Sequence, residues 1–366
     1  MSRAPKQKTT PADINATIAG LLQDLAAVQT IKPKKDAYEG AAEALFGLSD
    51  QLDRIRAAGP LPRIPGVGPS SLRIVEEVLK TGASPTVDAA VAASGKQDDV
   101  VRRRALRAHF FSRAEVLRIL ADETIGGVDP SAYRADFQMH SNWSDGAVSL
   151  AELARACADR GYTHMGSSDH AQGLRIARGM SMADAARQHR EIDAINAQHP
   201  DFRILKGLEA NIGSDGRLDF SDEDLAEFEL VLAAPHADLR IATDQTPRLL
   251  RALETPNVHI LAHPRGRKMG ARAGIVADWD AVFARAAKRR IAIEIDGDPM
   301  RQDMDWTMAK RALAAGCVFA LDSDAHAPDQ LIYAETAIAH ARLAGIPADR
   351  VVNCWPLAKL QKWAKR

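Results

Sequence analysis

The spacing of apolar residues divides the chain into two parts with different predicted secondary structure. In the first third, apolar positions recur at helical spacing from Asn15 to Val28, from Asp36 to Phe46 and from Ser70 to Thr81. Residues 96–121, which contain a cluster of arginines, follow a similar pattern and are predicted to form one further helix. No convincing alternating strand occurs there, so the first third is expected to be all-α.

Beyond residue 133, short β-rich runs alternate with helical stretches. This order is typical of βα units, and seven runs of this kind favour a closed or nearly closed parallel barrel over an open sheet. The predicted strands are residues 134–140, 163–170, 203–212, 230–239, 258–264, 292–298 and 318–326.

Turn-rich segments and changes of pattern suggest where the parts of the chain begin and end. The polar, basic segment 1–12 is predicted to be a disordered leader, because no signal-type apolar core follows it. We expect an all-α domain at 13–95, a basic helix and linker at 96–132, and an α/β barrel at 133–366.

Composition narrows the class of protein. The chain has 366 residues, of which 46% are hydrophobic and 26% charged, as in ordinary globular proteins. No apolar run approaches the roughly 18 residues of a membrane span, so we expect a cytoplasmic protein. The cysteines Cys157, Cys317 and Cys354 are far apart and odd in number, which argues against disulfides and favours buried apolar positions.

Charge is unevenly distributed along a chain whose formal net charge is zero. Residues 1–120 carry 18 Lys and Arg against 13 Asp and Glu, an excess of +5, which leaves −5 for the remainder. Such an excess permits a polyanionic partner without requiring one. The arginine cluster is expected to be a solvated helix face; it consists of Arg102, Arg103, Arg104 and Arg107.

A glycine-rich turn precedes the third predicted helix. Pro65, Gly66 and Gly68 make a tight connection that opens the helix beginning near Pro69. Backbone amides at such a helix start can hold a phosphate. A plain connection between two helices is the alternative, and the turn alone does not decide between them.

Most of the predicted strands end in side chains that can bind metal ions. In a parallel barrel these ends face one mouth, so residues distant in sequence become neighbours there. So many buried polar groups would lack partners unless they bound a ligand, which predicts a metal centre. Its members are His140 with Asp145, Asp169 with His170, Glu209, His236, His263, and Asp324 with His326. The mid-strand His164 and His259 are assigned structural roles.

These motifs resemble the PHP (polymerase and histidinol phosphatase) family of metallo-hydrolases. "HSNWSDG", "SDHAQGLRIARGMS", "GLEANI", "APH", "AHPRGR" and "DSDAH" follow in the family's order over roughly residues 133–345. The version of this domain at the C-terminus of bacterial family X DNA polymerases is the most similar. The resemblance implies a distorted seven-stranded TIM-like barrel with up to three metal ions.

The first third resembles the helix-hairpin-helix region of the same polymerases, although no polymerase palm fits between residues 85 and 133. The resemblance implies a grip on the DNA backbone that does not depend on base sequence. The implied DNA-binding residues are Gly66, Val67, Gly68, Ser70, Ser71 and Arg73. Ile74 stands where lyase-active relatives carry a lysine, which argues against lyase activity.

The family pattern also implies how the ligands are shared among the metals. Glu209 would bridge two ions, with His236 and His263 completing one site, and Asp145, His170 and His326 would hold another. The remaining site would use His140, Glu209, Asp324 and a first-strand histidine, but that histidine is Gln138 here. An amide oxygen is a poorer ligand than imidazole for zinc, so this site should be weakened or shifted toward Mn²⁺.

A mixed set of imidazoles and carboxylates suits two or three Mn²⁺ or Zn²⁺ ions better than Mg²⁺ or Ca²⁺. The implied chemistry is phosphoester hydrolysis by a metal-activated hydroxide, with arginines neutralising the phosphate. The predicted catalytic residues are Glu209, Asp324, His140, Arg175 and Arg267. Arg178 and Arg301 are further candidates for the phosphate clamp, and each arginine could equally be a surface salt-bridge partner.

Three functions are compatible with the sequence. The leading one is a metal-dependent phosphoesterase on DNA, of the 3′–5′ exonuclease or 3′-end-processing type. The second is a phosphatase for a small metabolite such as a histidinol phosphate-like ester. The third is a non-catalytic DNA-binding protein whose metal site has decayed, with Gln138 as the first lesion.

Overall fold

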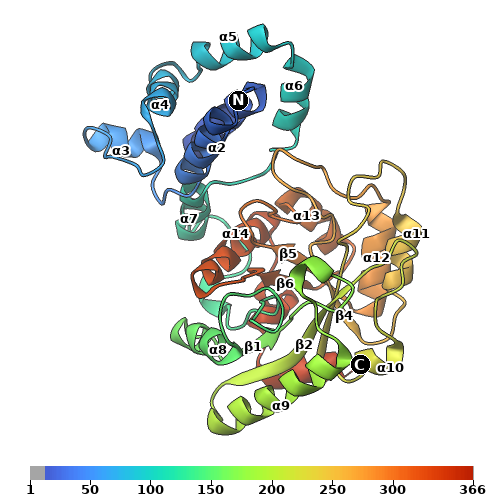
Figure 1. The fold of residues 1–366 in the computed structure, drawn as a ribbon. Helices are drawn as coiled ribbons and strands as arrows, with labels where there is room; N and C mark the ends of the chain where they lie inside the picture. Colours follow the sequence, from blue (N-terminus) through green and yellow to red (C-terminus); the bar gives the residue numbers. More distant parts are fainter. Residues whose placement is uncertain (1–12, 366) are drawn as a thin grey trace, which may run out of the picture. The chain divides into compact units, whose positions relative to one another are not determined.

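The computed structural model describes residues 13–365, so the predicted leader lies outside the described residues. The chain divides into two compact units between Leu117 and Arg118. The positions of the two units relative to one another are not determined, so each is described by itself (Figure 1).

The N-terminal unit is all-α, as predicted, and its helices pack around the first of them. Helix α1 contacts each of the next five helices and contributes the buried side chains of Ile18, Leu22 and Leu25. The helices of this unit are α1 (Ile14–Val28), α2 (Lys32–Phe46), α3 (Leu52–Ala58), α4 (Pro69–Thr81), α5 (Pro85–Ser94) and α6 (Gln97–Ala105).

The prediction of one helix over residues 96–121 is wrong. Helix α6 ends at Ala105, and α7 (Arg113–Ala121) begins only after a seven-residue break. His109 within the break has φ 62°, a left-handed conformation that cannot continue an α-helix. Ser112 then starts α7, because its hydroxyl accepts a hydrogen bond from the backbone amide of Glu115 at 3.3 Å.

The arginine cluster is not simply a solvated face. Arg104 and Arg107 both bind the carboxylate of Asp24, which is wholly buried in α1. Arg102 and Arg103 pair with Asp99 one turn earlier in α6. Arg104 and Arg107 therefore neutralise an acid in the core of this unit. Removing these arginines would leave the buried charge of Asp24 uncompensated.

The predicted glycine-rich turn leads directly into α4. Gly66 has φ 81°, the conformation that glycine adopts most easily, and the amide of Leu72 donates to the carbonyl of Gly68 at 2.9 Å. Ser70 and Arg73 are exposed, whereas Ser71 is buried. Ile74 is also buried, so that position of α4 packs into the unit's core.

The C-terminal unit contains a parallel six-stranded sheet with the strands in sequence order, flanked by helices (Figure 1). The α/β class and the parallel arrangement agree with prediction. The strands are β1 (His164–Ser167), β2 (Arg203–Asn211), β3 (Leu230–Ala234), β4 (Val258–Leu261), β5 (Ala292–Asp296) and β6 (Phe319–Asp322).

Helices lie in the connections between the parallel strands, as is usual in βα units. Helix α8 packs on β1, α9 on β2, α12 on β5, and α14 on both β5 and β6. The helices of this unit are α8 (Leu150–Asp159), α9 (Met182–Gln198), α10 (Asp222–Leu225), α11 (Thr246–Ala252), α12 (Trp279–Arg289), α13 (Trp306–Ala314), α14 (Ala334–Ala344) and α15 (Leu357–Ala364). Short 3₁₀ turns include η2 (Arg175–Ala177) and η3 (Pro328–Tyr333).

The first predicted strand, residues 134–140, is not a regular strand. It is an extended segment that lies between β1 and β6 and hydrogen-bonds to both sides. The amide of Gly166 in β1 donates to the carbonyl of Asp136, and the amide of His140 donates to the carbonyl of Ala325 just after β6. Side chains replace part of the ladder, since Ser168 and Asp322 accept from backbone amides of the segment. The two edges of the sheet are thereby joined.

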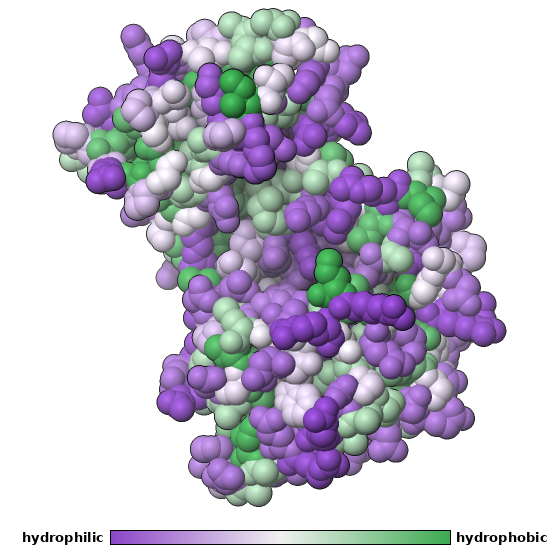
Figure 2. All heavy atoms as spheres, in the orientation of Figure 1, coloured by the Kyte–Doolittle hydropathy of each residue, from purple (hydrophilic) through white to green (hydrophobic). Residues whose placement is uncertain are grey.

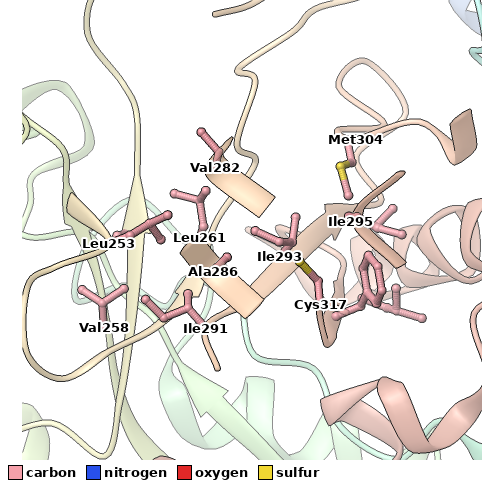
Figure 3. Close-up of a cluster of buried hydrophobic side chains, with 14 of the residues drawn as sticks. Leu253, Val258, Leu261, Val282, Ala286, Ile291, Ile293, Ile295, Met304 and Cys317 are labelled. Carbon is pink, nitrogen blue, oxygen red and sulfur yellow. The ribbon is translucent and has the colours of Figure 1, made fainter. Parts of the chain in front are cut away.

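The largest hydrophobic cluster lies between the sheet and its helices, and Figure 3 shows part of it. Ile293 and Ile295 of β5 belong to this cluster, together with Val282 of α12 and Cys317. Glu294 and Asp296 alternate with these isoleucines and are buried on the other face of the strand. The sheet therefore places acids on the face opposite the helices.

Two composition-based expectations can be compared with the structure. Cys157, Cys317 and Cys354 are all buried and unbridged, as predicted. Among residues 13–365, no helix combines the length and apolarity needed to cross a bilayer.

Candidate metal centre

The predicted ligands meet at the carboxyl ends of the strands. Glu209 lies in the second half of β2, and the other seven stand in the segments that follow strands or in the extended segment between β1 and β6. The residues that the structure brings together are His140, Asp145, His170, Glu209, His236, His263, Asp324 and His326. These residues are spread over nearly two hundred positions of the sequence. The parallel topology brings them together, because the ends of successive strands are neighbours in space.

Four imidazoles surround the carboxylate of Glu209, which is wholly buried. Its Oε1 lies 2.8 Å from Nε2 of His263 and 3.2 Å from Nε2 of His236. Its Oε2 lies 2.9 Å from Nδ1 of His170 and 3.5 Å from Nε2 of His140. One carboxylate thus faces ligands from four different elements, which is the geometry that a bridging role would need.

A second group lies beside the first. Asp145 Oδ1 is 3.6 Å from Nε2 of His170 and 3.5 Å from Nε2 of His326. The ring of His140 stacks on that of His170, with centroids 4.2 Å apart. His140, Asp145, His170 and His326 each offer an atom to a common position, as do His170, Glu209 and His236. His170 therefore belongs to both groups.

Asp324 connects the two groups to an arginine. Its Oδ1 lies 3.1 Å from Nε2 of His140, and its Oδ2 lies 2.9 Å from the guanidinium of Arg301. Asp324 has φ 54° and His263 has φ 25°, so two of the site residues hold left-handed backbone conformations. Such strain in residues other than glycine is concentrated at functional sites.

Gln138 is wholly buried, and neither its amide nitrogen nor its amide oxygen has a hydrogen-bond partner. Burying an unpaired amide is costly, so a group of the size and polarity of glutamine is poorly accommodated at this position. It lies two residues before His140 in the segment that joins β1 to β6.

The turn that carries Asp145 is clamped by a residue whose role the sequence analysis missed. Asp169 was grouped there with the strand-end ligands. It instead accepts hydrogen bonds from the amide and hydroxyl of Ser141 and from the amide and hydroxyl of Ser144. Gly146 closes the same turn so tightly that a Cβ atom there would lie 2.1 Å from the carbonyl oxygen of His140.

A second supporting residue orients His236. Nδ1 of His236 lies 2.6 Å from Oδ1 of Asn211 at the end of β2. The side-chain amide of Asn211 donates to Asp219, which also accepts from the Asn211 backbone amide at 3.0 Å. Holding one ring nitrogen fixes the direction in which the other faces Glu209. The sequence signal for this pair is weak, since asparagine and aspartate are common in turns.

The site's charges hold its acids ionised. Burial alone would raise the pKa of Glu209, but the facing His170 and His236 hold it well below its usual range. Burial also opposes ionisation of Asp324, yet Arg301 and His140 lower its pKa. Burial disfavours the charged form of His326, but Asp145 and Asp324 outweigh it and raise its pKa to about 9.

The residues present fit divalent cations. Within the described residues, Nδ1 of His140 is buried without a hydrogen-bond partner, and Oε2 of Glu209 and Nδ1 of His170 lie 2.9 Å apart in a geometry that does not meet that of a hydrogen bond. Such orphaned atoms in a cluster of imidazoles and carboxylates can be satisfied together by ions of the Zn²⁺ or Mn²⁺ type, which accept this donor set. The groupings can therefore hold divalent metal ions.

The four candidate arginines differ in what they contact. Arg267 is buried and donates to the carbonyls of Arg301 and Gln302 and to Asp305, so it holds the loop after β5. Its burial lowers its pKa to about 10. The guanidinium of Arg267 is thus engaged within the fold, whereas the sequence predicted a contact with a phosphate. Arg175 and Arg178 are exposed.

The histidines assigned structural roles do have structural partners. Nδ1 of His259 accepts from the amide of Val231 at 3.0 Å, and its Nε2 lies 2.8 Å from the carbonyl of Ala364. His164 lies in β1 with its Nδ1 2.9 Å from the hydroxyl of Thr163. Neither belongs to the candidate metal groups.

Comparison with known proteins now adds to the fold and the site. No protein-family model matches the chain. It is 36% identical over 245 residues to the DNA polymerase/3′-5′ exonuclease PolX of Bacillus subtilis, an alignment covering 67% of this chain and 43% of PolX. It is 31% identical over 173 residues to a probable phosphatase of Shewanella sediminis, covering 44% of this chain and 68% of that protein. A probable phosphatase of Tolumonas auensis is 29% identical over 237 residues, with 91% of its length covered.

A parallel sheet whose carboxyl ends gather imidazoles around one buried glutamate defines a metallo-hydrolase type of domain. The chain belongs to the PHP family of metal-dependent phosphoesterases. The chain spans 43% of the length of PolX.

Solved structures resemble the chain only distantly. The histidinol phosphate phosphatase of Lactococcus lactis, solved with zinc, L-histidinol and phosphate, aligns with a TM-score of 0.45 and 17% identity over 58% of this chain and 94% of that one. A putative histidinol phosphatase of Listeria monocytogenes gives a TM-score of 0.40 and 13% identity.

Proposed function

We propose that this protein is a metal-dependent phosphoesterase that acts on DNA ends, as a 3′–5′ exonuclease or a 3′-end-processing enzyme. The observation that carries the proposal is the ring of four imidazoles around the buried Glu209, in a chain that also contains an all-α unit with a glycine-rich turn at a helix start. The similarity to PolX, which is named as a 3′-5′ exonuclease, supports DNA as the substrate.

In this proposal the site residues have distinct tasks. Glu209, His236 and His263 would hold one cation, and Asp145, His170 and His326 would hold another, with His140 and Asp324 beside both. When bound, such cations polarise a phosphoryl oxygen and lower the pKa of water so that a nucleophile exists at neutral pH.

The protein's own residues would orient the substrate and the ligands. Arg301 is held at Asp324 and, with 29% of its side chain exposed, can also reach an incoming phosphate. His140 is buried, and burial lowers its pKa, so at neutral pH it is an uncharged imidazole with a lone pair available. Asn211 keeps His236 in one orientation through its 2.6 Å contact.

The N-terminal unit would bind the DNA duplex. At the start of α4, Ser70 and Arg73 are exposed beside the glycine-rich turn, which suits contacts to phosphates without base recognition. This unit would act as a helix-hairpin-helix that binds DNA. The side chain of Ser71 is buried and would not contact the DNA.

The test uses the full chain, Mn²⁺ and two 3′-recessed duplexes with a labelled 3′ strand, one ending in a 3′ hydroxyl and the other in a 3′ phosphate. We expect release of mononucleotides or of 3′ phosphate by the wild type and at least a thousand-fold slower release by Asp324→Ala. Asp329→Ala, which changes an exposed acid five residues away, is the matched control. Equal rates for Asp324→Ala and wild type, or no release by either, would overturn the proposal.

A second candidate is a phosphatase for small phosphate monoesters, and the relatives named as probable phosphatases favour it. The same preparation is therefore given histidinol phosphate. Fast release of phosphate from this ester with no action on any DNA end would replace the first proposal with the second. A protein that contains no metal and hydrolyses neither substrate would favour a DNA-binding protein with a decayed site.

A further inference from the structure

The loop of residues 171–180 is rooted in the metal centre at both ends. The amide of Ala171 donates to the carbonyl of Glu209 at 2.9 Å, and the amide of Met180 donates to the carbonyl of His170 at 2.7 Å. The loop thus begins and ends on the backbone of two candidate ligands. Whatever its tip contacts is held at a fixed place relative to them.

Two further contacts hold the loop in one conformation. The amide of Gly173 donates to Oδ2 of Asp219 at 3.0 Å, and Asp219 is the residue that also fixes Asn211 beside His236. Gly179 packs so closely on the neighbouring chain that a Cβ atom would lie 1.9 Å from the carbonyl oxygen of Ala171. The loop is therefore connected to His236 through Asp219 and Asn211, as well as to the backbone of His170 and Glu209.

The tip of this fixed loop presents an apolar side chain and two cations to solvent. Ile176 is 91% exposed, whereas its neighbour Ala177 is buried and anchors the 3₁₀ turn η2. Arg175 and Arg178 are exposed, and within the described part of the chain neither forms an ion pair. The backbone of Arg178 has φ 55°, a left-handed conformation in which the chain turns at the end of η2.

This combination differs from the rest of the unit's surface. Figure 2 shows a largely hydrophilic face on which apolar side chains are scattered in small areas. The other exposed large apolar residues of this unit, Ile241 and Val276, are 43% and 49% exposed, about half as much as Ile176. A nearly fully solvated isoleucine on a tightly held loop, between two unpaired arginines, is suited to a ligand that has both an apolar face and phosphates.

We propose that the loop 171–180 holds the terminal nucleotide of the substrate strand, with Ile176 packed against the face of the last base. Arg175 and Arg178 would contact the adjoining phosphates. This inference rests on the proposed function and narrows its substrate to strands whose terminal nucleotide carries a base. Aliphatic side chains serve as such contacts in other nucleic-acid-binding proteins, and guanidinium groups bind phosphates well.

The test compares two 3′-recessed duplexes that differ only in the terminal nucleotide, which is either normal or an abasic tetrahydrofuran. Ile176→Ala is expected to raise KM for the normal end about ten-fold, the scale of one lost base contact, with kcat within about two-fold. On the abasic end its KM is expected to equal that of the wild type. Ile176→Leu should restore most of the affinity, and Val276→Ala, at another exposed apolar position, should leave KM for both duplexes unchanged.

Each other result contradicts the inference. If Ile176→Ala has the wild-type KM on the normal end, or raises KM equally on both ends, the isoleucine does not contact the base. If the wild type cleaves neither DNA end but hydrolyses histidinol phosphate, the proposed function fails, and this inference fails with it. The two failures are distinguishable because the second is visible in the wild type alone.

Discussion

Asp169 accepts hydrogen bonds from both the backbone amide and the hydroxyl of Ser141, at 2.8 and 2.7 Å. Ser141 directly follows His140, so this pair fixes where the ligand-bearing turn leaves the extended segment. The hydroxyl of Ser144, next to Asp145, donates to the same carboxylate at 2.6 Å. One buried acid therefore sets the positions of two candidate ligands without facing the metal groups itself.

Asp169→Asn is expected to weaken metal binding. The amide nitrogen of asparagine is a donor, so it cannot accept the bonds that one carboxylate oxygen now receives. Loss of a residue that orients metal ligands through hydrogen bonds typically lowers metal affinity 10- to 100-fold. Calorimetric titration of Mn²⁺ into the metal-free protein measures the effect. Asp201→Asn, at an exposed position, controls for the change in charge, and equal affinities for the two variants would contradict the assigned role.

Gln138→His is expected to increase the number or affinity of bound metal ions. The present side chain is wholly buried with both amide atoms unpaired, and imidazole is a stronger ligand for Zn²⁺ than an amide oxygen. Elemental analysis of the purified variant should show up to one additional ion per chain. Gln198→His, which adds an imidazole at the exposed end of α9, should leave the metal content unchanged. An unaltered ion count in Gln138→His would show that this position does not contact a metal.

Asp322 should make the metal-free protein less stable as the pH rises. Burial raises its pKa from 3.8 to about 6, so between these values the folded chain keeps a proton that the unfolded chain releases. Its stabilising contribution is present below about pH 4 and is lost as the pH rises through 6. Between pH 4 and pH 7 the unfolding free energy of both proteins is compared. The decrease should be roughly 1–3 kcal/mol smaller for Asp322→Asn than for the wild type.

Urea unfolding in the presence of a chelator, at several pH values between 4 and 7.5, measures this difference. Asp329→Asn, at an exposed position, should follow the wild type over the whole range. The same slope for Asp322→Asn and wild type would mean that this carboxyl does not titrate in the folded protein.

Arg73→Glu is expected to weaken DNA binding more than Lys80→Glu. Both residues are exposed on α4, but Arg73 is its fifth residue, close to the glycine-rich connection, and Lys80 lies in its last turn. The two substitutions change the net charge equally, so a difference between them reports a local contact. Fluorescence anisotropy with a duplex should show about a three- to ten-fold larger loss for Arg73→Glu and a salt slope lower by about one. Equal losses would reduce the interaction to overall charge.

The sequence was sufficient to predict the residues that meet at the candidate site, because parallel strands in sequence order leave little freedom in where their carboxyl ends lie. It was also sufficient for the all-α first third and for the positions of α1 and α4. It was not sufficient for Asp169 and Asn211, whose roles depend on which hydroxyl or imidazole the fold brings beside them. In the sequence, an aspartate that supports a turn cannot be distinguished from one that binds a metal ion until its hydrogen-bond partners are known.

Two errors had signals that could have been used. The break between α6 and α7 is marked by Ser112 and Glu115, the spacing of a helix start, but the arginine cluster suggested continuity. Helix α5 was not predicted, although Ser84, Pro85 and Gly95 are strong start and stop residues. The irregular pairing of residues 134–140 had no such signal, because its bonds come from Ser168 and Asp322, far away in the chain.

The extended segment 134–140 is where the two edges of the sheet in the C-terminal unit meet. Because the stretch that ends in His140 also joins the first strand to the last, a cation held there would connect two edges that are otherwise bridged by only a few backbone and side-chain hydrogen bonds. Loading with Mn²⁺ should therefore slow deuterium uptake at the amides of Phe137 and Gly166 more than in the middle of the sheet. Binding of the ion and separation of the segment 134–140 from β1 and β6 would then be thermodynamically linked.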